Sequence, residues 1–153
     1  MRIRLAHSPD PDDAFMFYGL ASGAVDPGPY EFEHVRADIQ TLNERAQAGE
    51  YEVSAISIRA YPQVSGNYAL ATCGCSMGDN YGPLLVSRTP LTVEALVGRT
   101  IAVPGLMTTA YLTLQLLLGP GRFEPRVVMF DRIPDEVASA LINSVLVMLR
   151  KPS

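Results

Sequence analysis

Residues 2–23, RIRLAHSPDPDDAFMFYGLASG, predict a strand, a rigid loop and a helix in succession. Apolar and charged residues alternate over residues 2–6, which is the pattern of a half-buried strand. The loop that follows contains two prolines, and each fixes its own φ and holds the residue before it in extended backbone. We expect Asp12 to cap a helix over residues 13–22, which Gly23 ends.

Strand and helix patterns keep alternating along the rest of the chain, which predicts an α/β fold with mostly parallel strands. Further strands are expected at residues 30–36, 53–57 (short and buried), 68–73, 83–88, 100–103, 126–130 and 145–149. Further helices are expected between Asp38, as N-cap, and Gly49, near residues 59–64, and at residues 92–96, 108–118 and 134–140. A second series of strands and helices begins after the extended segment 84–88. We therefore expect two lobes, residues 1–87 and residues 88–153.

The composition excludes several classes of protein. The chain has 153 residues, of which 48% are hydrophobic, so it can bury a core of ordinary size and is not a disordered chain. Its net charge of −4 and the lack of a basic stripe argue against nucleic acid and anionic membranes as partners. No apolar run reaches the ~18 residues of a membrane span, and the first residues lack the pattern of a signal peptide. We therefore expect a cytoplasmic protein with no membrane partner.

The loop 8–13 contains three carboxylates, and three interpretations of it compete. Asp10, Asp12 and Asp13 could ligate Mg²⁺ or Ca²⁺, which prefer oxygen ligands. Alternatively, Asp12 only caps the helix while Asp13 interacts with the positive end of the helix dipole. The third interpretation places the loop in the wall of a ligand pocket, because loops at the carboxyl ends of parallel strands bind ligands in open α/β sheets.

Two further segments could present polar groups to a ligand. Ser57 ends a predicted buried strand, where it can expose its hydroxyl and a free backbone N–H. Thr108 and Thr109 stand at the start of a predicted helix, whose first N–H groups lack acceptors and attract anions. Either threonine could also serve only as the N-cap. Facing one another, the two segments would form a pocket for a carboxylate.

The cysteines and histidines form weaker patterns. Cys73 and Cys75 cannot build a disulfide framework, and a lone C-x-C pair falls short of the four ligands of a structural zinc site. His7 and His34 are too far apart in the sequence for a metal-ligand motif, and we expect His7 to form a local hydrogen bond. These patterns predict no metal site.

Several segments together resemble a known family. Residues 7–18, HSPDPDDAFMFY, resemble the amino-terminal motif S-P-x-P-[ND]-D-x-F-x-F-Y of the 1,4-dihydroxy-6-naphthoate synthases, enzymes of the futalosine route to menaquinone. The other similar segments are DIQTLN at 38–43, Ser57 with Ala60 and Tyr61, GPL at 82–84, AVPG at 102–105 and TTAY at 108–111. The resemblance extends from about residue 3 to residue 138.

The resemblance implies a fold, a reaction and a set of site residues. The fold would be the two-lobed α/β fold of type II periplasmic binding proteins. The reaction would convert cyclic dehypoxanthinyl futalosine to 1,4-dihydroxy-6-naphthoate, a lyase reaction with no metal and no organic cofactor. The positions that match binding residues for this small carboxylate substrate are Ala55, Ile56, Ser57, Thr108 and Thr109. Ser8 and Asp13 of the acidic loop are added as candidate substrate-binding residues.

The sequence departs from the family at the position of the proposed catalytic base. The family has an apolar-apolar-His-Glu segment there, whereas this chain has Leu149 at the His position and Arg150 at the Glu position. A leucine cannot accept a proton, so base catalysis by that residue is absent. The family continues well beyond this point, and no acidic residue follows Glu136 in this chain. We therefore expect an inactive or partial member with a truncated second lobe, produced by a frame change or a premature stop.

Two other functions stay open at this stage. A solute-binding protein would share the two lobes, although it would normally carry a signal peptide or a lipid anchor. Chorismate dehydratase, the sibling enzyme of the same route, is the other alternative, and the SPDPDDAF start speaks against it. The apolar strand 145–149 would leave an exposed edge on the second lobe, which favours a homodimer.

Overall fold

The computed structural model describes residues 1–79, 82–139 and 144–148. The chain divides into two compact units, Met1–Met77 and Gly78–Ser153. This division differs from the predicted boundary at residue 87 by a segment that contains the strand β4, Pro83–Val86. The hydrogen bonds of β4 run to a strand of the second unit. The predicted positions Leu149 and Arg150 lie outside the described residues.

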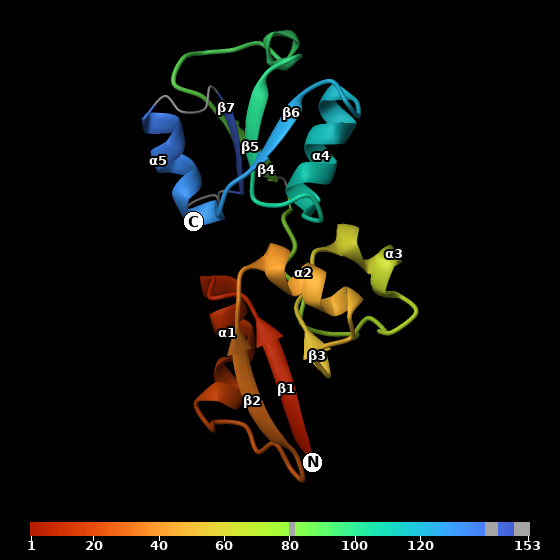
Figure 1. The fold of residues 1–153 in the computed structure, drawn as a ribbon. Coiled ribbons are helices and arrows are strands. Elements are labelled where there is room, and N and C mark those ends of the chain that lie inside the picture. The colour runs from red at the N-terminus through yellow and green to blue at the C-terminus, as the bar shows by residue number, and fades with distance from the viewer. Residues whose placement is uncertain (80–81, 140–143, 149–153) are drawn as a thin grey trace. The chain divides into compact units, whose positions relative to one another are not determined.

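A three-stranded parallel sheet in the order β2-β1-β3 forms the centre of the first unit (Figure 1). Its strands are β1, Arg2–His7; β2, Glu31–Arg36; and β3, Val53–Ser54. β1 pairs with β2 along its whole length, from Arg2 opposite Glu31 to His7 opposite Arg36. Because both neighbours of β1 run parallel to it, the loops that follow the three strands leave the sheet at the same edge.

The helices of the first unit begin near the predicted positions, with one correction. They are α1, Pro11–Ala21; α2, Ile39–Gln47; a 3₁₀ turn, Ile58–Ala60; and α3, Tyr61–Val64. The N-cap of α1 is Asp10, not Asp12, which lies inside the first turn. Pro11 explains the difference, because its fixed φ suits the first helical position and starts the helix two residues earlier. Asp38 caps α2 as predicted, and its carboxylate accepts a hydrogen bond from the Thr41 N–H at 3.0 Å.

Two strand predictions in this unit were wrong in extent or existence. The strand predicted at residues 53–57 ends after Ser54, and Val53 is 42% exposed rather than buried. The strand predicted at residues 68–73 does not form, and Leu70 within it is 53% exposed. An apolar stretch becomes a strand only where a neighbouring strand supplies hydrogen bonds, and this segment pairs with none of the described strands. Its first residue, Tyr68, instead donates its hydroxyl to the Tyr51 carbonyl at 2.6 Å.

The core of the first unit lies on one face of its sheet. Ala6 of β1, Leu42 of α2 and Tyr51 are buried against one another, with Ala55 packed on them. His7 points to the opposite face, because side chains alternate along a strand, and its ring lies 5.1 Å from that of Phe17 in α1. α2 therefore covers one face of β1, and α1 borders the other.

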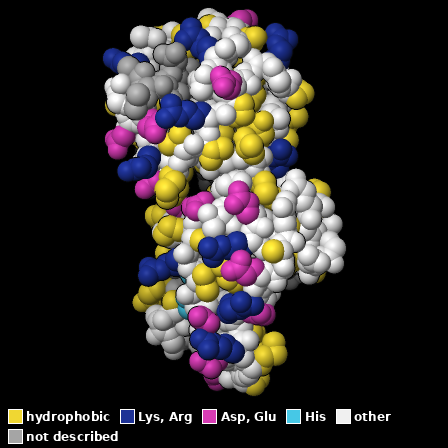
Figure 2. All heavy atoms as spheres, in the orientation of Figure 1, with side chains coloured by type: hydrophobic (Ala, Val, Ile, Leu, Met, Phe, Trp, Pro, Cys, Tyr) yellow, Lys and Arg dark blue, Asp and Glu magenta, His cyan; other side chains and the backbone are white. Residues whose placement is uncertain are grey.

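Charged side chains of both signs are interspersed over the part of the first unit that β1 and β2 form (Figure 2). Arg2 lies 3.0 Å from Glu33, and Arg4 lies 2.7 Å from Glu52. The hydrogen bonds that Arg4 donates to Glu52 lower the pKa of that carboxyl to about 2. The acidic net charge of the chain is thus locally balanced here.

The second unit contains a four-stranded sheet in the order β4-β7-β5-β6 (Figure 1). Its other strands are β5, Thr100–Val103; β6, Glu124–Val127; and β7, Ser144–Met148. β5 is parallel to β6 and β7, and β4 is antiparallel to β7. β5 has the predicted bounds, whereas β6 begins and ends earlier than the predicted strand 126–130. The prediction that the strand 145–149 leaves an exposed edge was wrong, because β7 is paired with β4 on one side and β5 on the other, and the edges of this sheet are β4 and β6.

Helices lie on both faces of this second sheet (Figure 1). They are α4, Thr109–Leu118, and α5, Ile133–Ala138, with 3₁₀ turns at Glu94–Leu96 and Phe130–Arg132. Ile101 and Val103 of β5 are buried with Leu114 of α4. Ala102, which points the other way, is buried with Ile133 and Val137 of α5. The uninterrupted apolar run of β5 is explained by this burial on both faces.

We expect the replacement Asp38→Ala to lower the free energy of unfolding by about 0.5–2 kcal/mol, because α2 loses its N-cap. Burial raises the pKa of Asp38, but hydrogen bonds from Thr41 outweigh that effect and leave the pKa below its usual value. The contribution of the carboxylate is therefore complete above the unfolded-state pKa of about 3.9 and is lost as the pH falls through the folded-state pKa. Urea unfolding followed by circular dichroism, at neutral and at acidic pH, measures both effects.

The matched control is Asp38→Asn, which keeps a capping oxygen but does not titrate. This variant should be nearly as stable as the unaltered chain at neutral pH. Its free energy of unfolding should lack the pH dependence that the Asp38 carboxylate contributes. An Asp38→Ala variant that unfolds at the same urea concentration as the unaltered chain would contradict the capping role.

Candidate functional site

Ser57 is held by a buried side chain that the sequence analysis did not single out. Asn43 of α2 is 0% exposed. Its Oδ1 accepts a hydrogen bond from the Ser57 N–H at 2.8 Å, and its Nδ2 donates to the Ser57 Oγ at 3.1 Å. The prediction of a free N–H at Ser57 was therefore wrong, because Asn43 satisfies it. The Ser57 hydroxyl accepts from Asn43, which leaves its own hydrogen available to donate to a ligand.

A signal for Asn43 is present in the sequence. Asn43 stands four residues after Ile39 and three before Ala46, which places it on the apolar face of the predicted helix. A polar residue on a buried face needs a hydrogen-bond partner. Helical spacing alone could have predicted a buried amide here, although not that its partner is Ser57.

Ala55 and Ile56 join β3 to Ser57. The Ala55 N–H donates to the Ala6 carbonyl at 2.8 Å, which continues the hydrogen bonding between the chain and β1 beyond the end of β3. Ser57 then acts as N-cap of the 3₁₀ turn, and its carbonyl accepts from the Ala60 N–H at 2.8 Å. All three predicted residues are half-buried and lie at the edge of the sheet where β1 ends.

The acidic loop brings the candidates Ser8 and Asp13 into direct contact. Ser8 is buried, and its N–H donates to Oδ2 of Asp13 at 2.7 Å. Its hydroxyl donates to Oδ2 of Asp10 at 2.5 Å. Burial raises the pKa of Asp13, and the Ser8 N–H offsets this only in part. Asp13 is therefore easier to protonate than an ordinary aspartate.

The three carboxylates of this loop accept hydrogen bonds from serines. Asp10 and Asp13 bond to Ser8, and Oδ2 of Asp12 accepts from the Ser76 hydroxyl at 2.8 Å. Within the part of the chain that the structure describes, no group of three or more His, Cys, Asp or Glu side chains is arranged to hold a metal ion. Cys73 and Cys75 are exposed thiols without a disulfide.

His7 and His34 are neighbours in space despite their separation in sequence. His7 is buried, its Nδ1 lies 2.9 Å from the Ser8 carbonyl, and its Nε2 lies 3.2 Å from Nδ1 of His34. The expectation of a local hydrogen bond for His7 is confirmed by the bond to Ser8. Burial and the nearby His7 ring lower the pKa of His34. The pair thus supports the backbone at the start of the acidic loop, through the bond of His7 to the Ser8 carbonyl.

Thr108 and Thr109 have different roles at the start of α4. Thr108 is the N-cap, as one of the two open alternatives predicted. Its hydroxyl donates to the Gly105 carbonyl at 2.7 Å and accepts from the Tyr111 N–H at 3.3 Å. The Thr109 hydroxyl forms no hydrogen bond with any described residue, and the first N–H groups of a helix, here those of Thr109 and Ala110, have no acceptor within it. This end of α4 can therefore bind an anion through Thr109 and the backbone.

A protein-family comparison matches residues 3–148 to a family described as menaquinone biosynthesis. The chain belongs to the menaquinone biosynthesis family. The match extends from β1 to β7 and includes every candidate binding residue discussed above.

Curated relatives and a solved structure agree with this membership. The 1,4-dihydroxy-6-naphthoate synthases of Thermus thermophilus and Streptomyces coelicolor are 40% and 37% identical to the chain, over 95% of it and 52% of each relative. A crystal structure of an Archaeoglobus fulgidus protein is 45% identical, with a TM-score of 0.88, over 96% of this chain and 53% of that one. The chain thus spans about half the length of the family members that it matches.

The fold is that of periplasmic solute-binding proteins. An alkanesulfonate-binding protein from Xanthomonas axonopodis pv. citri superposes with a TM-score of 0.65 at 14% identity, over 96% of this chain and 54% of that one. The predicted fold class is confirmed, and at this identity the likeness concerns the fold alone. In the described ranges, each helix is too short or too polar to cross a membrane.

The replacement Asn43→Ala should lower the free energy of unfolding by about 1–3 kcal/mol, because it removes both bonds to Ser57 and leaves polar groups in the unit's interior without partners. Thermal or urea unfolding measures the loss. In the same variant, hydrogen exchange at the Ser57 N–H should become faster, since the acceptor of that N–H is gone.

The control is Asn67→Ala, which removes the same side chain at an exposed position. Its free energy of unfolding should change by no more than about 0.5 kcal/mol. Equal effects of the two replacements, or unchanged exchange at Ser57 in Asn43→Ala, would show that Asn43 does not position Ser57.

Proposed function

We propose that this chain provides binding residues of a 1,4-dihydroxy-6-naphthoate synthase site, with cyclic dehypoxanthinyl futalosine as the ligand. The observation that carries the proposal is the match of 95% of the chain to two relatives that bear this enzyme name. The ligand is a small molecule with a carboxylate, which agrees with the polar but uncharged donors at the candidate positions.

In the first unit, Ser57 donates its hydroxyl to the ligand, and Ala55 and Ile56 form the adjoining wall. The fixed orientation of Ser57 supports this role, because Asn43 donates to its hydroxyl oxygen and accepts from its N–H, and the hydroxyl hydrogen stays available to donate. Ser8 and Asp13 are proposed to border the same site from the acidic loop, since their mutual hydrogen bond fixes that loop at the end of β1. The raised pKa of Asp13 lets this carboxyl donate a hydrogen bond when protonated.

In the second unit, the start of α4 is proposed as a site for a carboxylate. The Thr109 hydroxyl and the N–H groups of Thr109 and Ala110 are the proposed donors, and the helix dipole favours the negative charge. Thr108 contributes chiefly as the N-cap that holds this turn, because its hydroxyl hydrogen is already donated to Gly105.

We further propose that the chain binds the ligand without converting it efficiently. The reaction needs a base to remove a proton from carbon, and the position that corresponds to the family's proposed base is Leu149. No metal or organic cofactor enters this proposal. The proton acceptor would have to be another residue, and the carboxylate among the candidate binding residues is Asp13, whose pKa is raised by burial.

The two alternatives are not favoured. The resemblance to solute-binding proteins amounts to 10–15% identity and concerns the fold, and neither curated relative is named a chorismate dehydratase. A homodimer remains a proposal. It would use the edge strand β4, where Leu84 and Val86 are exposed, because β6 contains Pro125 and is a poorer partner for a second chain.

We expect Thr109→Ala to weaken the binding of cyclic dehypoxanthinyl futalosine roughly tenfold or more, because one hydrogen bond to a carboxylate is lost. Isothermal titration calorimetry with the full chain measures this change. The control is Thr113→Ala in the same helix, whose hydroxyl bonds only to the Thr109 carbonyl and should leave the affinity unchanged. Equal affinity of the Thr109→Ala variant would remove Thr109 from the site, and no binding by the unaltered chain would overturn the proposed function.

We also expect the chain to form 1,4-dihydroxy-6-naphthoate at least ~10²-fold more slowly than the T. thermophilus relative under the same conditions, because the loss of a general base costs about 10²–10⁴ in rate. Product is measured by chromatography after incubation with the proposed substrate. Turnover at the rate of the relative would show that a base other than residue 149 acts, and His7 would be the first residue to replace.

A further inference from the structure

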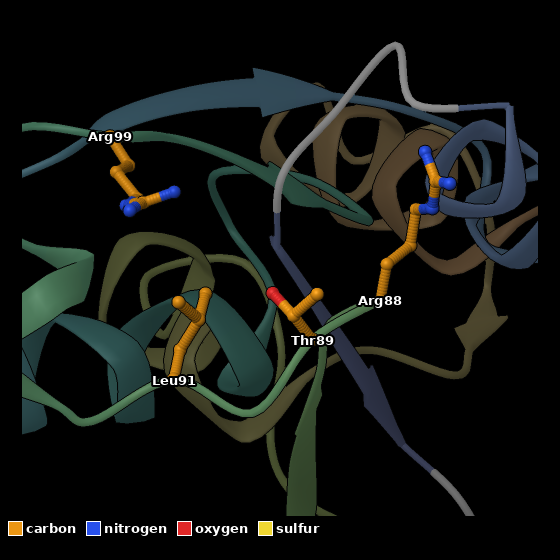
Figure 3. Close-up of a pocket in the computed structure, with 4 residues that line it drawn as sticks. All are labelled: Arg88, Thr89, Leu91 and Arg99. Atoms are coloured by element: carbon orange, nitrogen blue, oxygen red, sulfur yellow. The ribbon is translucent and has the colours of Figure 1, made fainter.

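The pocket of the second unit does not bring its two arginines together (Figure 3). It has a volume of about 220 Å³ and is lined by Arg88, Thr89, Leu91 and Arg99. The guanidinium of Arg88 points away from Arg99, and Thr89 lies between them. The pocket therefore offers no converging donors to a ligand.

Three sulfur-containing side chains of the first unit belong to two segments that lie against each other. Cys73 and Cys75 are separated only by Gly74, and both thiols are exposed. Consecutive Cα atoms are about 3.8 Å apart, so those of the two cysteines are at most about 7.6 Å apart. A disulfide needs a Cα separation of about 4.4–6.8 Å, and a metal ion that stands between two sulfurs tolerates a wider one.

Met16 of α1 brings a third sulfur to this pair. Gly74 has a φ of +77°, which lies in the left-handed region, and it has no side chain to keep a neighbour away. A Cβ atom added at Gly74 would lie 3.2 Å from Sδ of Met16. This sulfur therefore lies against the backbone that joins the two cysteines.

A second contact holds the same loop on α1. The Ser76 hydroxyl donates to Oδ2 of Asp12 at 2.8 Å. Asp12 and Met16 are four residues apart and so lie on one face of the helix. The loop that contains the cysteines thus contacts α1 at two successive turns of that face, which fixes the loop beside Met16.

The ligand set selects a soft metal ion. Among the described residues, no His, Asp or Glu joins the two cysteines in a group of three that could hold a metal ion. Hard cations such as Mg²⁺ and Ca²⁺ need oxygen ligands, and a structural Zn²⁺ site needs four ligands. Thiolates and thioethers instead suit Cu(I). The sequence predicted no metal site at the cysteine pair, because Met16 joins it only in the folded chain.

We propose that Cys73, Cys75 and Met16 form a binding site for one Cu(I) ion. The two cysteines bind as thiolates and Met16 binds through its thioether, which gives a three-coordinate site of sulfur ligands. Binding releases the two thiol protons to the solvent and leaves copper in its Cu(I) state, so no oxidant or reductant is consumed. None of the three residues is among the candidate binding residues for the ligand proposed above, so the two proposals are independent.

The test is an anaerobic titration of the full, reduced chain with Cu(I) in competition with bicinchoninate, a chelator whose Cu(I) complex is coloured. One ion per chain is expected to bind, and X-ray absorption at the copper edge should show three sulfur neighbours. Cys73→Ser and Cys75→Ser should each weaken binding about a hundredfold or more, because a hydroxyl is a poor ligand for Cu(I). Both cysteines are exposed, so these replacements test the site without disturbing the fold.

Met16→Leu tests the third ligand, since it keeps the apolar volume of the side chain and removes the sulfur. This variant should bind Cu(I) about tenfold more weakly, because it loses a soft ligand. Its copper should have two sulfur neighbours instead of three, which a merely structural role of Met16 would not produce. Far-UV circular dichroism checks that each variant is folded.

The matched control is Met77→Leu, which removes the same sulfur from an exposed side chain two residues after Cys75. Its affinity for Cu(I) should stay within about twofold of the unaltered chain, as for most exposed replacements. Unchanged affinity with three sulfur neighbours in Met16→Leu, a greater loss in Met77→Leu than in Met16→Leu, or one ion shared by two chains would each overturn the proposal. Binding of Zn²⁺ as tight as that of Cu(I), measured with a zinc indicator, would also overturn it.

Discussion

Parallel pairing of a central strand is the constraint on which both units depend. β1 lies between β2 and β3, and β5 lies between β6 and β7, and each of these pairs is parallel. A chain can reach a parallel neighbour only by crossing back over the sheet, so a helix intervenes and its apolar side covers a face. The same geometry collects the loops that follow the strands at one edge of each sheet. Ser8 and Ser57 stand at that edge in the first unit, and Thr109 stands there in the second.

The elements that were predicted correctly are those whose signals are complete within a few residues. Asp38 caps α2 because an acceptor side chain directly before an apolar helical face is a local signal. β5 has its predicted bounds because four apolar or β-branched residues stand between Arg99 and Pro104. The strand expected at residues 68–73 failed for the converse reason, since its existence depends on a partner that no local pattern specifies. The start of α1 was misplaced because the sequence offers several acidic caps, and the position of Pro11 decides between them.

The candidate site could be predicted at the level of segments but not of hydrogen bonds. The sequence pointed to the acidic loop, to the end of β3 and to the start of α4, because strand ends and helix starts expose polar groups wherever they occur. It could not show that Asn43 bonds to Ser57, since that contact depends on how α2 crosses the sheet. It could not bring His7 and His34 together either, because their proximity follows from the register of β1 on β2. Packing and strand register depend on the whole unit, so a local sequence pattern cannot predict either of them.

The hydrogen bonds of His7 and His34 determine which ring nitrogen of each carries a hydrogen. The Ser8 carbonyl can only accept, so Nδ1 of His7 carries the hydrogen of that bond, and the hydrogen between the two rings then belongs to Nδ1 of His34. The remaining lone pair is that of Nε2 of His34, a buried atom without a partner among the described residues. A proton on that nitrogen would be a buried charge without a hydrogen-bond acceptor, and burial together with the neighbouring His7 ring lowers the pKa of His34. The chain of hydrogen bonds from Nδ1 of His34 through the His7 ring to the Ser8 carbonyl therefore ties β2 to the start of the acidic loop.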